Sequence, residues 1–133
     1  MAGALDLGLF ERARSAVNAD PAFRKLGTAD VSVGIRRGDD AFLVRFEAFE
    51  CAGVEAVDED RIRDADFELT LAGTGWDRYL AERRAGRAPS LLSLDLDTPG
   101  GILRGRDPRL TLKFERYQAT LQAFVDKSAE LAA

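Results

Sequence analysis

The chain changes its hydrophobic period within a few residues near its middle, and this change constrains the fold more than any other feature. Apolar and polar residues alternate over residues 66–72, which predicts a strand. A helix with Trp76 on its apolar stripe is predicted directly afterwards, over residues 75–84, with Thr74 placed to cap it. A strand that passes straight into a helix favours a sheet with helices packed on it.

The first half of the chain predicts two helices followed by a meander of strands. Apolar residues recur at helical spacing over residues 4–18. Asp20-Pro21 then begins a short helix over residues 22–26, which Gly27 ends. Alternating apolar residues predict three strands next, at residues 31–35, 41–48 and 49–58.

The C-terminal part predicts an apolar turn over residues 89–94, a short strand over residues 102–105 and one long helix that begins at Asp107-Pro108. One face of this last helix carries Leu110, Phe114, Tyr117, Leu121, Phe124 and Leu131. The predicted order is two helices, four strands, two helices, a strand and a helix. This order favours an α+β fold: a five-stranded, mainly antiparallel sheet covered by helices on one side.

Length and composition indicate an ordinary globular protein. With 133 residues, 46% hydrophobic and 32% charged, the chain is expected to form a single domain over residues 1–133. No apolar run approaches the roughly 20 residues that a membrane-spanning helix needs. The first residues lack the basic start and apolar core of a secretion signal, so a cytoplasmic location is expected.

The absence of histidine excludes several classes of enzyme. Without imidazole the chain cannot form a Ser-His-Asp or Cys-His nucleophilic site or a histidine-ligated metal centre. Cys51 is the only cysteine, so an internal disulfide and a multi-cysteine zinc site are excluded as well. Acid–base chemistry would have to use carboxylates, Lys or Tyr. We therefore expect no catalytic residue, no metal and no cofactor.

Three polar motifs each have a simple structural explanation. The Gly-Thr-Gly segment at residues 73–75 follows a strand, but it lacks the third glycine of a dinucleotide site and the lysine of a P-loop. The acidic run at residues 58–60 lacks the spacing of a calcium loop. Cys51, beside Glu50, is interpreted as a small buried apolar residue. We therefore interpret the Gly-Thr-Gly segment as a turn, the acidic run as a solvated loop and Cys51 as a core residue.

Positive charge is concentrated in one part of an acidic chain. The net charge is −4, yet residues 78–116 hold nine Arg and Lys against five Asp and Glu, a local charge of +4. Such a zone either is a solvated surface or attracts anionic headgroups at a membrane. If the arginines of this zone surround the mouth of a pocket, we expect them to attract anionic headgroups. These residues are Arg83, Arg84, Arg87, Arg104, Arg106 and Arg109.

The large apolar residues fit an interior site better than a nucleic-acid surface. Nucleic-acid binding needs exposed aromatic residues among basic ones. Here the aromatic residues fall on helix faces that would be buried, and the sequence pI is near 4.9. The pattern is consistent with a filled core and with an apolar cavity. Periodicity alone does not separate the two.

The order of these segments resembles the sterol carrier protein type-two lipid-binding domain, over about residues 10–131. The resemblance is carried by the strand DADFELTLAG before the Trp76 helix, by the leucine-rich PSLLSLDL, and by GGILRGRDPRLTLKFERYQATLQAFV. It implies a small sheet covered by helices around an apolar tunnel. The implied activity is non-enzymatic binding and transfer of a sterol, a fatty acid or another apolar small molecule, without a cofactor.

We expect the ligand-binding residues to be the large apolar groups of the helices and of the facing strands: Phe46, Leu69, Trp76, Leu80, Leu92, Leu94, Ile102, Tyr117, Leu121 and Phe124. An apolar pocket with one or two orienting polar groups is sufficient for such binding. Two alternatives remain open at this point. One is an enzyme, such as an isomerase or cyclase, that uses carboxylate and tyrosine groups on a hydrophobic substrate. The other is a protein-interaction module.

Overall fold

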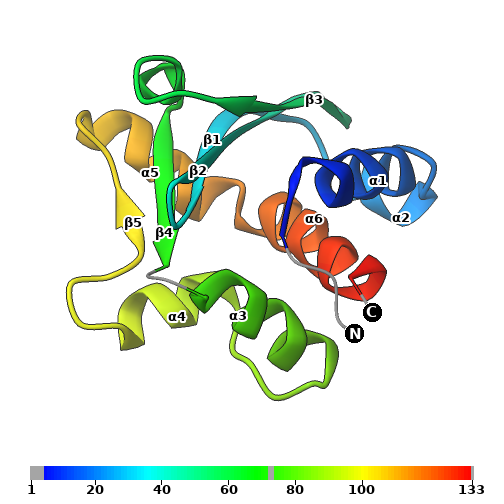
Figure 1. Ribbon diagram of the computed structural model, residues 1–133. Helices are drawn as coiled ribbons and strands as arrows, with labels where there is room; N and C mark the ends of the chain where they lie inside the picture. Colours follow the sequence, from blue (N-terminus) through cyan, green and yellow to red (C-terminus); the bar gives the residue numbers. More distant parts are fainter. Residues whose placement is uncertain (1–4, 72–73, 133) are drawn as a thin grey trace.

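The computed structural model describes residues 5–71 and 74–132, which form a five-stranded sheet with helices packed against it (Figure 1). In chain order the elements are α1 (Leu7–Asn18), α2 (Pro21–Arg24), β1 (Ala29–Arg37), β2 (Asp40–Ala48), β3 (Glu50–Val57), the 3-10 helix η1 (Arg61–Asp64), β4 (Phe67–Leu71), α3 (Gly75–Arg84), α4 (Leu91–Asp97), β5 (Leu103–Arg104), α5 (Pro108–Arg116) and α6 (Gln118–Leu131). The α+β class is confirmed.

The strand order across the sheet is β3-β2-β1-β4-β5. β1, β2 and β3 form an antiparallel meander, and β5 pairs with β4 in the antiparallel sense. β4 returns to lie beside β1 and runs parallel to it, with Val33 opposite Phe67 and Ile35 opposite Leu69. The sheet is therefore mainly antiparallel, as expected, with one parallel pair.

Aromatic contacts join one face of the sheet to the helices. Phe42 on β2 lies 5.5 Å from Phe10 on α1, measured between ring centroids, and the rings meet edge to face. Phe67 on β4 makes a similar contact of 5.7 Å with Phe114 on α5. α1 and α6 also pack against each other (Figure 1). This face holds the main core, because alternate residues of each strand point toward it.

The prediction of one long C-terminal helix is wrong, because the helix breaks at Tyr117. Tyr117 has φ −109° and ψ 20°, outside the helical range, so α5 ends before it and α6 begins after it. α5 packs through Phe114 on β4, whereas α6 packs on α1 and α3. A straight helix could not follow both surfaces. The sequence has neither proline nor glycine at the break, so periodicity gave no sign of it.

The opposite face of the sheet is covered locally by η1, which directly follows the acidic run at residues 58–60. Ile62 of η1 is completely buried and packs over Gly34 of β1. A Cβ atom at Gly34 would lie 2.9 Å from Ile62 Cγ1, closer than side chains tolerate. The glycine is therefore needed for this contact.

The remaining elements follow the predictions with small shifts. α1 begins at Leu7, where the side chain of Asp6 accepts a hydrogen bond from the amide of Leu9; residue 4 lies outside the described residues. α4, the second of the two helices expected between β4 and β5, extends over Leu91–Asp97, and Ser90 caps it. The bounds of α3 are as predicted, although the Thr74 side chain makes no capping hydrogen bond within the described part. None of the helices in residues 5–71 and 74–132 has the length and apolar character to span a bilayer.

Candidate functional site

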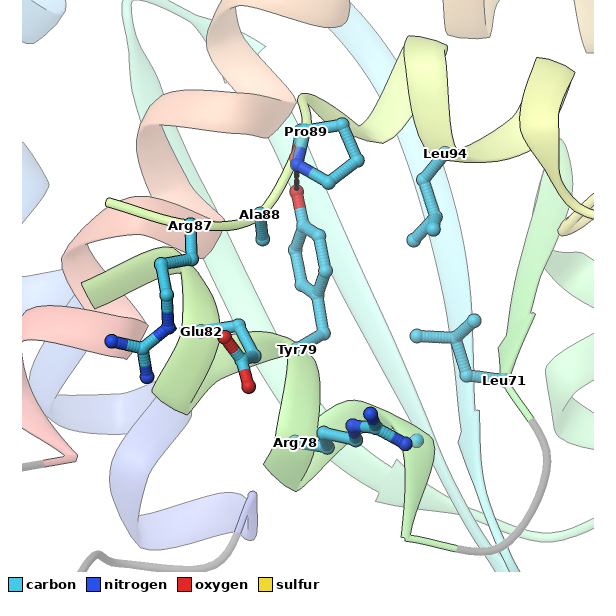
Figure 2. A pocket seen from close by; sticks show the side chains of 9 residues that line it. Leu71, Arg78, Tyr79, Glu82, Arg87, Ala88, Pro89 and Leu94 are labelled. Atoms are coloured by element: carbon cyan, nitrogen blue, oxygen red, sulfur yellow. Dashed lines mark hydrogen bonds and ion pairs between the residues drawn. The ribbon is translucent and has the colours of Figure 1, made fainter. Parts of the chain in front are cut away.

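A pocket of about 360 Å³ lies where β4 ends, α3 begins and the chain returns through α4 (Figure 2). We call it the α3–α4 pocket. Its apolar lining comes from Leu71, Ala88, Pro89, Leu94 and the ring of Tyr79. Figure 2 shows Leu71 and Leu94 across the opening from the Tyr79 ring. The lining is completed by Gly75, Arg78, Glu82 and Arg87.

The geometry of α3 explains how one helix serves both the pocket and the core. Residues three or four apart share a helix face. Gly75, Arg78, Tyr79 and Glu82 therefore form a stripe toward the pocket, whereas Trp76 and Leu80 face the core. Tyr79 is the member of the pocket stripe that also contacts the core residue Trp76. Its side chain is buried and also forms part of the pocket wall.

A polar network holds the segment that closes one side of the pocket. The Tyr79 hydroxyl donates a 2.8 Å hydrogen bond to the carbonyl of Pro89, and the Arg83 guanidinium donates one of 3.0 Å to the carbonyl of Ala88. Gln122 on α6 accepts a 2.6 Å hydrogen bond from the amide of Leu91. Three side chains on two helices thus fix the backbone of residues 88–91.

Asp126 on α6 anchors this network. Its carboxylate accepts a 2.8 Å hydrogen bond from Nε of Arg83 and a 2.9 Å hydrogen bond from Nε2 of Gln122. Gln122 Nε2 also lies 3.4 Å from the Tyr79 hydroxyl oxygen. The network therefore connects α3, α6 and the 88–91 segment, so the pocket wall is held by the core helices.

The ionisation of Tyr79 bears on what the pocket can do chemically. Burial raises the pKa of Tyr79 above its ordinary value, although the hydrogen bond from Gln122 and the charge of Arg83 oppose this shift. The phenol is therefore neutral near pH 7, and its proton is engaged with Pro89. Tyr79 suits a structural role and an apolar contact better than proton abstraction.

Trp76 is a buried group with an unused hydrogen-bond donor. The side chain is 0% exposed and meets Tyr79 edge to face, with ring centroids 6.2 Å apart. Among the described residues its indole Nε1 has no hydrogen-bond partner. Buried polar groups are nearly always paired, so an unpaired donor needs an explanation such as a water or a ligand. The Trp76 ring packs against Tyr79, which is part of the pocket wall.

Three charged side chains, Arg78, Glu82 and Arg87, contribute to the lining of the pocket. Glu82 and Arg87 form an ion pair of 2.8 Å, and Figure 2 shows them on the side of Tyr79 away from Leu71 and Leu94. Arg78 is exposed. A mostly apolar lining with a few charged side chains suits a molecule that is mostly apolar with a polar end.

The ten ligand-binding residues predicted from the sequence all belong to or pack against one apolar cluster. Leu94 lines the α3–α4 pocket, and Trp76 and Leu80 lie on the core face of the same α3 helix. Leu92 and Tyr117 are half-buried at the border of the cluster. The other five are buried inside it: Phe46, Leu69, Ile102, Leu121 and Phe124.

Direct ring contacts fill the region between α6 and the sheet. The rings of Phe46 and Phe124 meet edge to face at 5.6 Å, and Phe10 lies 5.3 Å from Phe124. Phe46 and Phe124, two of the expected ligand-binding residues, are therefore in direct contact with each other. Neither of them lines the α3–α4 pocket.

Sequence reasoning missed the pocket residues Leu71, Tyr79, Ala88 and Pro89. The role of Tyr79 in holding Pro89 depends on a contact between separate segments, which helical periodicity does not reveal. The strand alternation that includes Leu71 was a usable signal, because it placed this leucine on the core face at the end of β4.

The six arginines expected around one opening are distributed over several surfaces. Arg87 lines the α3–α4 pocket, whereas Arg83 and Arg84 line a hollow beside Asp126. Arg104 and Arg106 line a groove at β5. Arg109 forms a 3.4 Å ion pair with Asp107. The basic zone of the sequence is therefore not one basic patch.

The other motifs noted in the sequence do not form a functional site among the described residues. Burial raises the pKa of the Cys51 thiol to about 12, although nearby Arg14 opposes the shift. The side chain is fully buried, so it is a neutral core group. Gly73 lies outside the described residues. Within residues 5–71 and 74–132, no group of acidic or cysteine side chains is arranged to hold a metal ion.

No protein-family model matches the chain, and neither a curated protein nor a solved structure matches it. The geometry of the α3–α4 pocket therefore carries the functional argument.

Proposed function

We propose that the protein is a non-enzymatic binder or carrier of an apolar small molecule, such as a sterol or a fatty acid, and that this molecule enters through the α3–α4 pocket. The observation that carries the proposal is the apolar lining of this pocket, in which Tyr79 contacts Trp76, a buried residue whose indole N–H has no hydrogen-bond partner among the described residues. The resemblance of the sequence to the sterol carrier protein type-two domain supports the same class of ligand.

The size and chemistry of the pocket support binding. Its volume of about 360 Å³ falls within the range of about 300–1,000 Å³ that is typical of small-molecule sites. Burial of an alkyl chain contributes about 0.8 kcal/mol per methylene group, so a short length of chain gives useful affinity without any charged contact.

The polar groups near the pocket favour binding over catalysis. The Tyr79 hydroxyl is committed to Pro89, and the Glu82 carboxylate is paired with Arg87. A general base needs a free acceptor within reach of the substrate. The carboxylate and tyrosine of this pocket are both engaged by other groups of the protein.

The first experiment is extraction of the purified protein followed by mass spectrometry, and titration with dodecanoic acid and with cholesterol. Trp76 is the only tryptophan, so its emission reports on the region behind Tyr79. We expect a saturable change in emission with one of the two probes. The absence of binding to both, together with a lipid-free extract, would contradict the proposal.

A pair of variants on one short helix locates the site. Leu94→Asp places a charge in the pocket lining, whereas Leu96→Asp places the same charge two residues away on a side chain that is 78% exposed. We expect Leu94→Asp to lower the affinity for the probe at least tenfold and Leu96→Asp to leave it unchanged. Equal loss in both variants would place binding elsewhere.

A further inference from the structure

A second groove, of about 510 Å³, lies at the other end of β4 from the α3–α4 pocket. It forms where the start of β4, the end of β5 and the start of α5 meet, and we call it the arginine groove. Its lining consists of Arg63, Ala65, Asp66, Phe67, Glu68, Arg104, Gly105, Arg106, Asp107 and Leu110. It shares none of these residues with the α3–α4 pocket.

Three arginines of the groove carry positive charge that no carboxylate neutralises at contact distance. Within residues 5–71 and 74–132, Arg63, Arg104 and Arg106 have no carboxylate oxygen within 4.0 Å. Seven other basic side chains of the described residues also lack such a partner, so the distinguishing feature of the groove is that three of these arginines line it together.

The acidic residues of the same groove are already paired with other cations. Asp66 lies 3.1 Å from the Lys113 ammonium, and Asp107 lies 3.4 Å from the Arg109 guanidinium. Glu68 forms an ion pair with Arg36. Since each carboxylate has its own partner, the positive charge of the three groove arginines remains available to an anion.

Backbone contacts position two of these arginines. Nη1 of Arg104 donates hydrogen bonds to the carbonyl oxygens of Gly100 at 2.9 Å, Gly101 at 3.1 Å and Leu103 at 3.0 Å. Nη2 of Arg106 donates one of 3.3 Å to the carbonyl oxygen of Arg63. Each guanidinium is thus held through one nitrogen. The other N–H groups of its planar fork make no hydrogen bond within the described part of the chain.

Gly105 allows this arrangement. A Cβ atom at this position would lie 2.1 Å from Cγ2 of Thr111 on α5, so only glycine permits α5 to approach the end of β5 this closely. Arg104 and Arg106 are two residues apart and line the same groove. The base of the groove also contains the apolar side chains Phe67 and Leu110.

We propose that the arginine groove binds a phosphate ester, with Arg63, Arg104 and Arg106 contacting the phosphate oxygens. Arginine is suited to this role because its fork of N–H donors matches the spacing of phosphate oxygens and its charge is permanent. Phe67 and Leu110 provide an apolar surface for the organic part of the ester. This site is independent of the apolar ligand proposed for the α3–α4 pocket.

The test uses the full chain labelled with ¹⁵N and two sources of phosphate. Glycerol 3-phosphate represents a free phosphoester, and vesicles of phosphatidylglycerol, compared with vesicles of phosphatidylcholine, represent a lipid headgroup. We expect the arginine Nε–Hε signals of Arg104 and Arg106 to shift saturably with glycerol 3-phosphate, or the protein to co-sediment with phosphatidylglycerol alone. Binding should weaken as salt is added.

Two double variants that change the net charge equally distinguish a specific phosphate-binding site from general electrostatic attraction. Arg104→Gln with Arg106→Gln changes the groove, and Arg12→Gln with Arg24→Gln changes exposed positions on α1 and α2. We expect the first pair to weaken phosphate binding at least tenfold and the second to leave it unchanged, with both proteins folded by thermal melting. Binding to neither phosphate source, or equal loss in both pairs, would overturn the proposal.

Discussion

The hydroxyl of Tyr79 donates a 2.8 Å hydrogen bond to the carbonyl oxygen of Pro89, and this contact ties the pocket wall to α3. The two residues are ten apart in the sequence, and the chain between them leaves the helix and turns back over the pocket. Gln122 reaches the same tyrosine from α6. The shape of the pocket therefore depends on the packing of α3 against α6.

Tyr79→Phe removes this hydrogen bond and keeps the aromatic ring. We expect a loss of about 0.5–1.5 kcal/mol in the free energy of unfolding, because the Pro89 carbonyl loses its donor. Urea unfolding measures this loss. The affinity for an apolar ligand should also fall, since the 88–91 segment loses one of its three anchors. An unchanged unfolding midpoint together with unchanged affinity would show that the hydrogen bond does not shape the pocket.

Asp77 gives the protein a defined sensitivity to acid. The hydrogen bond from Arg37 lowers the pKa of Asp77 below its ordinary value, and the hydrogen bond from the amide of Leu5 adds to this effect. Because the folded-state pKa lies below the unfolded one, the contribution is fully present above about pH 4 and is lost as the pH falls through the folded-state pKa.

Asp77→Asn should therefore lower stability at pH 7 and flatten the decline between pH 4 and pH 2. Asp39→Asn, on an exposed turn residue, serves as the control. Thermal melting over this pH range measures both variants. A decline as steep in Asp77→Asn as in the parent protein would assign the acid sensitivity to other carboxylates.

The thiol of Cys51 should be unreactive toward thiol reagents in the folded protein. Its thiol is fully buried and burial raises its pKa to about 12, so the reactive thiolate is nearly absent at pH 8. We expect negligible reaction with a disulfide reagent in native buffer and complete reaction in denaturant. Rapid labelling of the native protein would show that the α1–β3 contact opens readily.

Gly34→Ala tests the contact between η1 and the outer face of the sheet. The added methyl group would lie 2.9 Å from both Ile62 Cγ1 and Glu68 Cγ, and overpacking of this kind costs about 1–3 kcal/mol. Ile62→Ala removes the first of these two contacts, so the double variant should lose less stability than the sum of the two single changes. Additive losses would show that the two positions do not compete for the same space.

The parts of the fold that depend on local patterns were predicted well. The alternation at residues 67–71 and the helix at residues 75–84 are set by neighbours in the sequence, and both are confirmed. The break at Tyr117 and the cover provided by η1 depend on surfaces brought together from distant segments. The same holds for the pocket, since Tyr79 and Gln122 are 43 residues apart. Periodicity identified the apolar cluster but not the place where it opens.

Leu121→Trp distinguishes a filled core from a cavity beneath α6. Leu121 is 3% exposed, on the helix whose Phe124 ring contacts Phe46 directly. A larger side chain there should overpack the interior and lower the free energy of unfolding by about 1–3 kcal/mol. Leu112→Trp, at a position 62% exposed on α5, should cost little and serves as the control. Ligand affinity should persist in the folded fraction of Leu121→Trp, because the α3–α4 pocket is lined by other residues. A stable Leu121→Trp protein that no longer takes up lipid would instead place the ligand between α6 and the sheet.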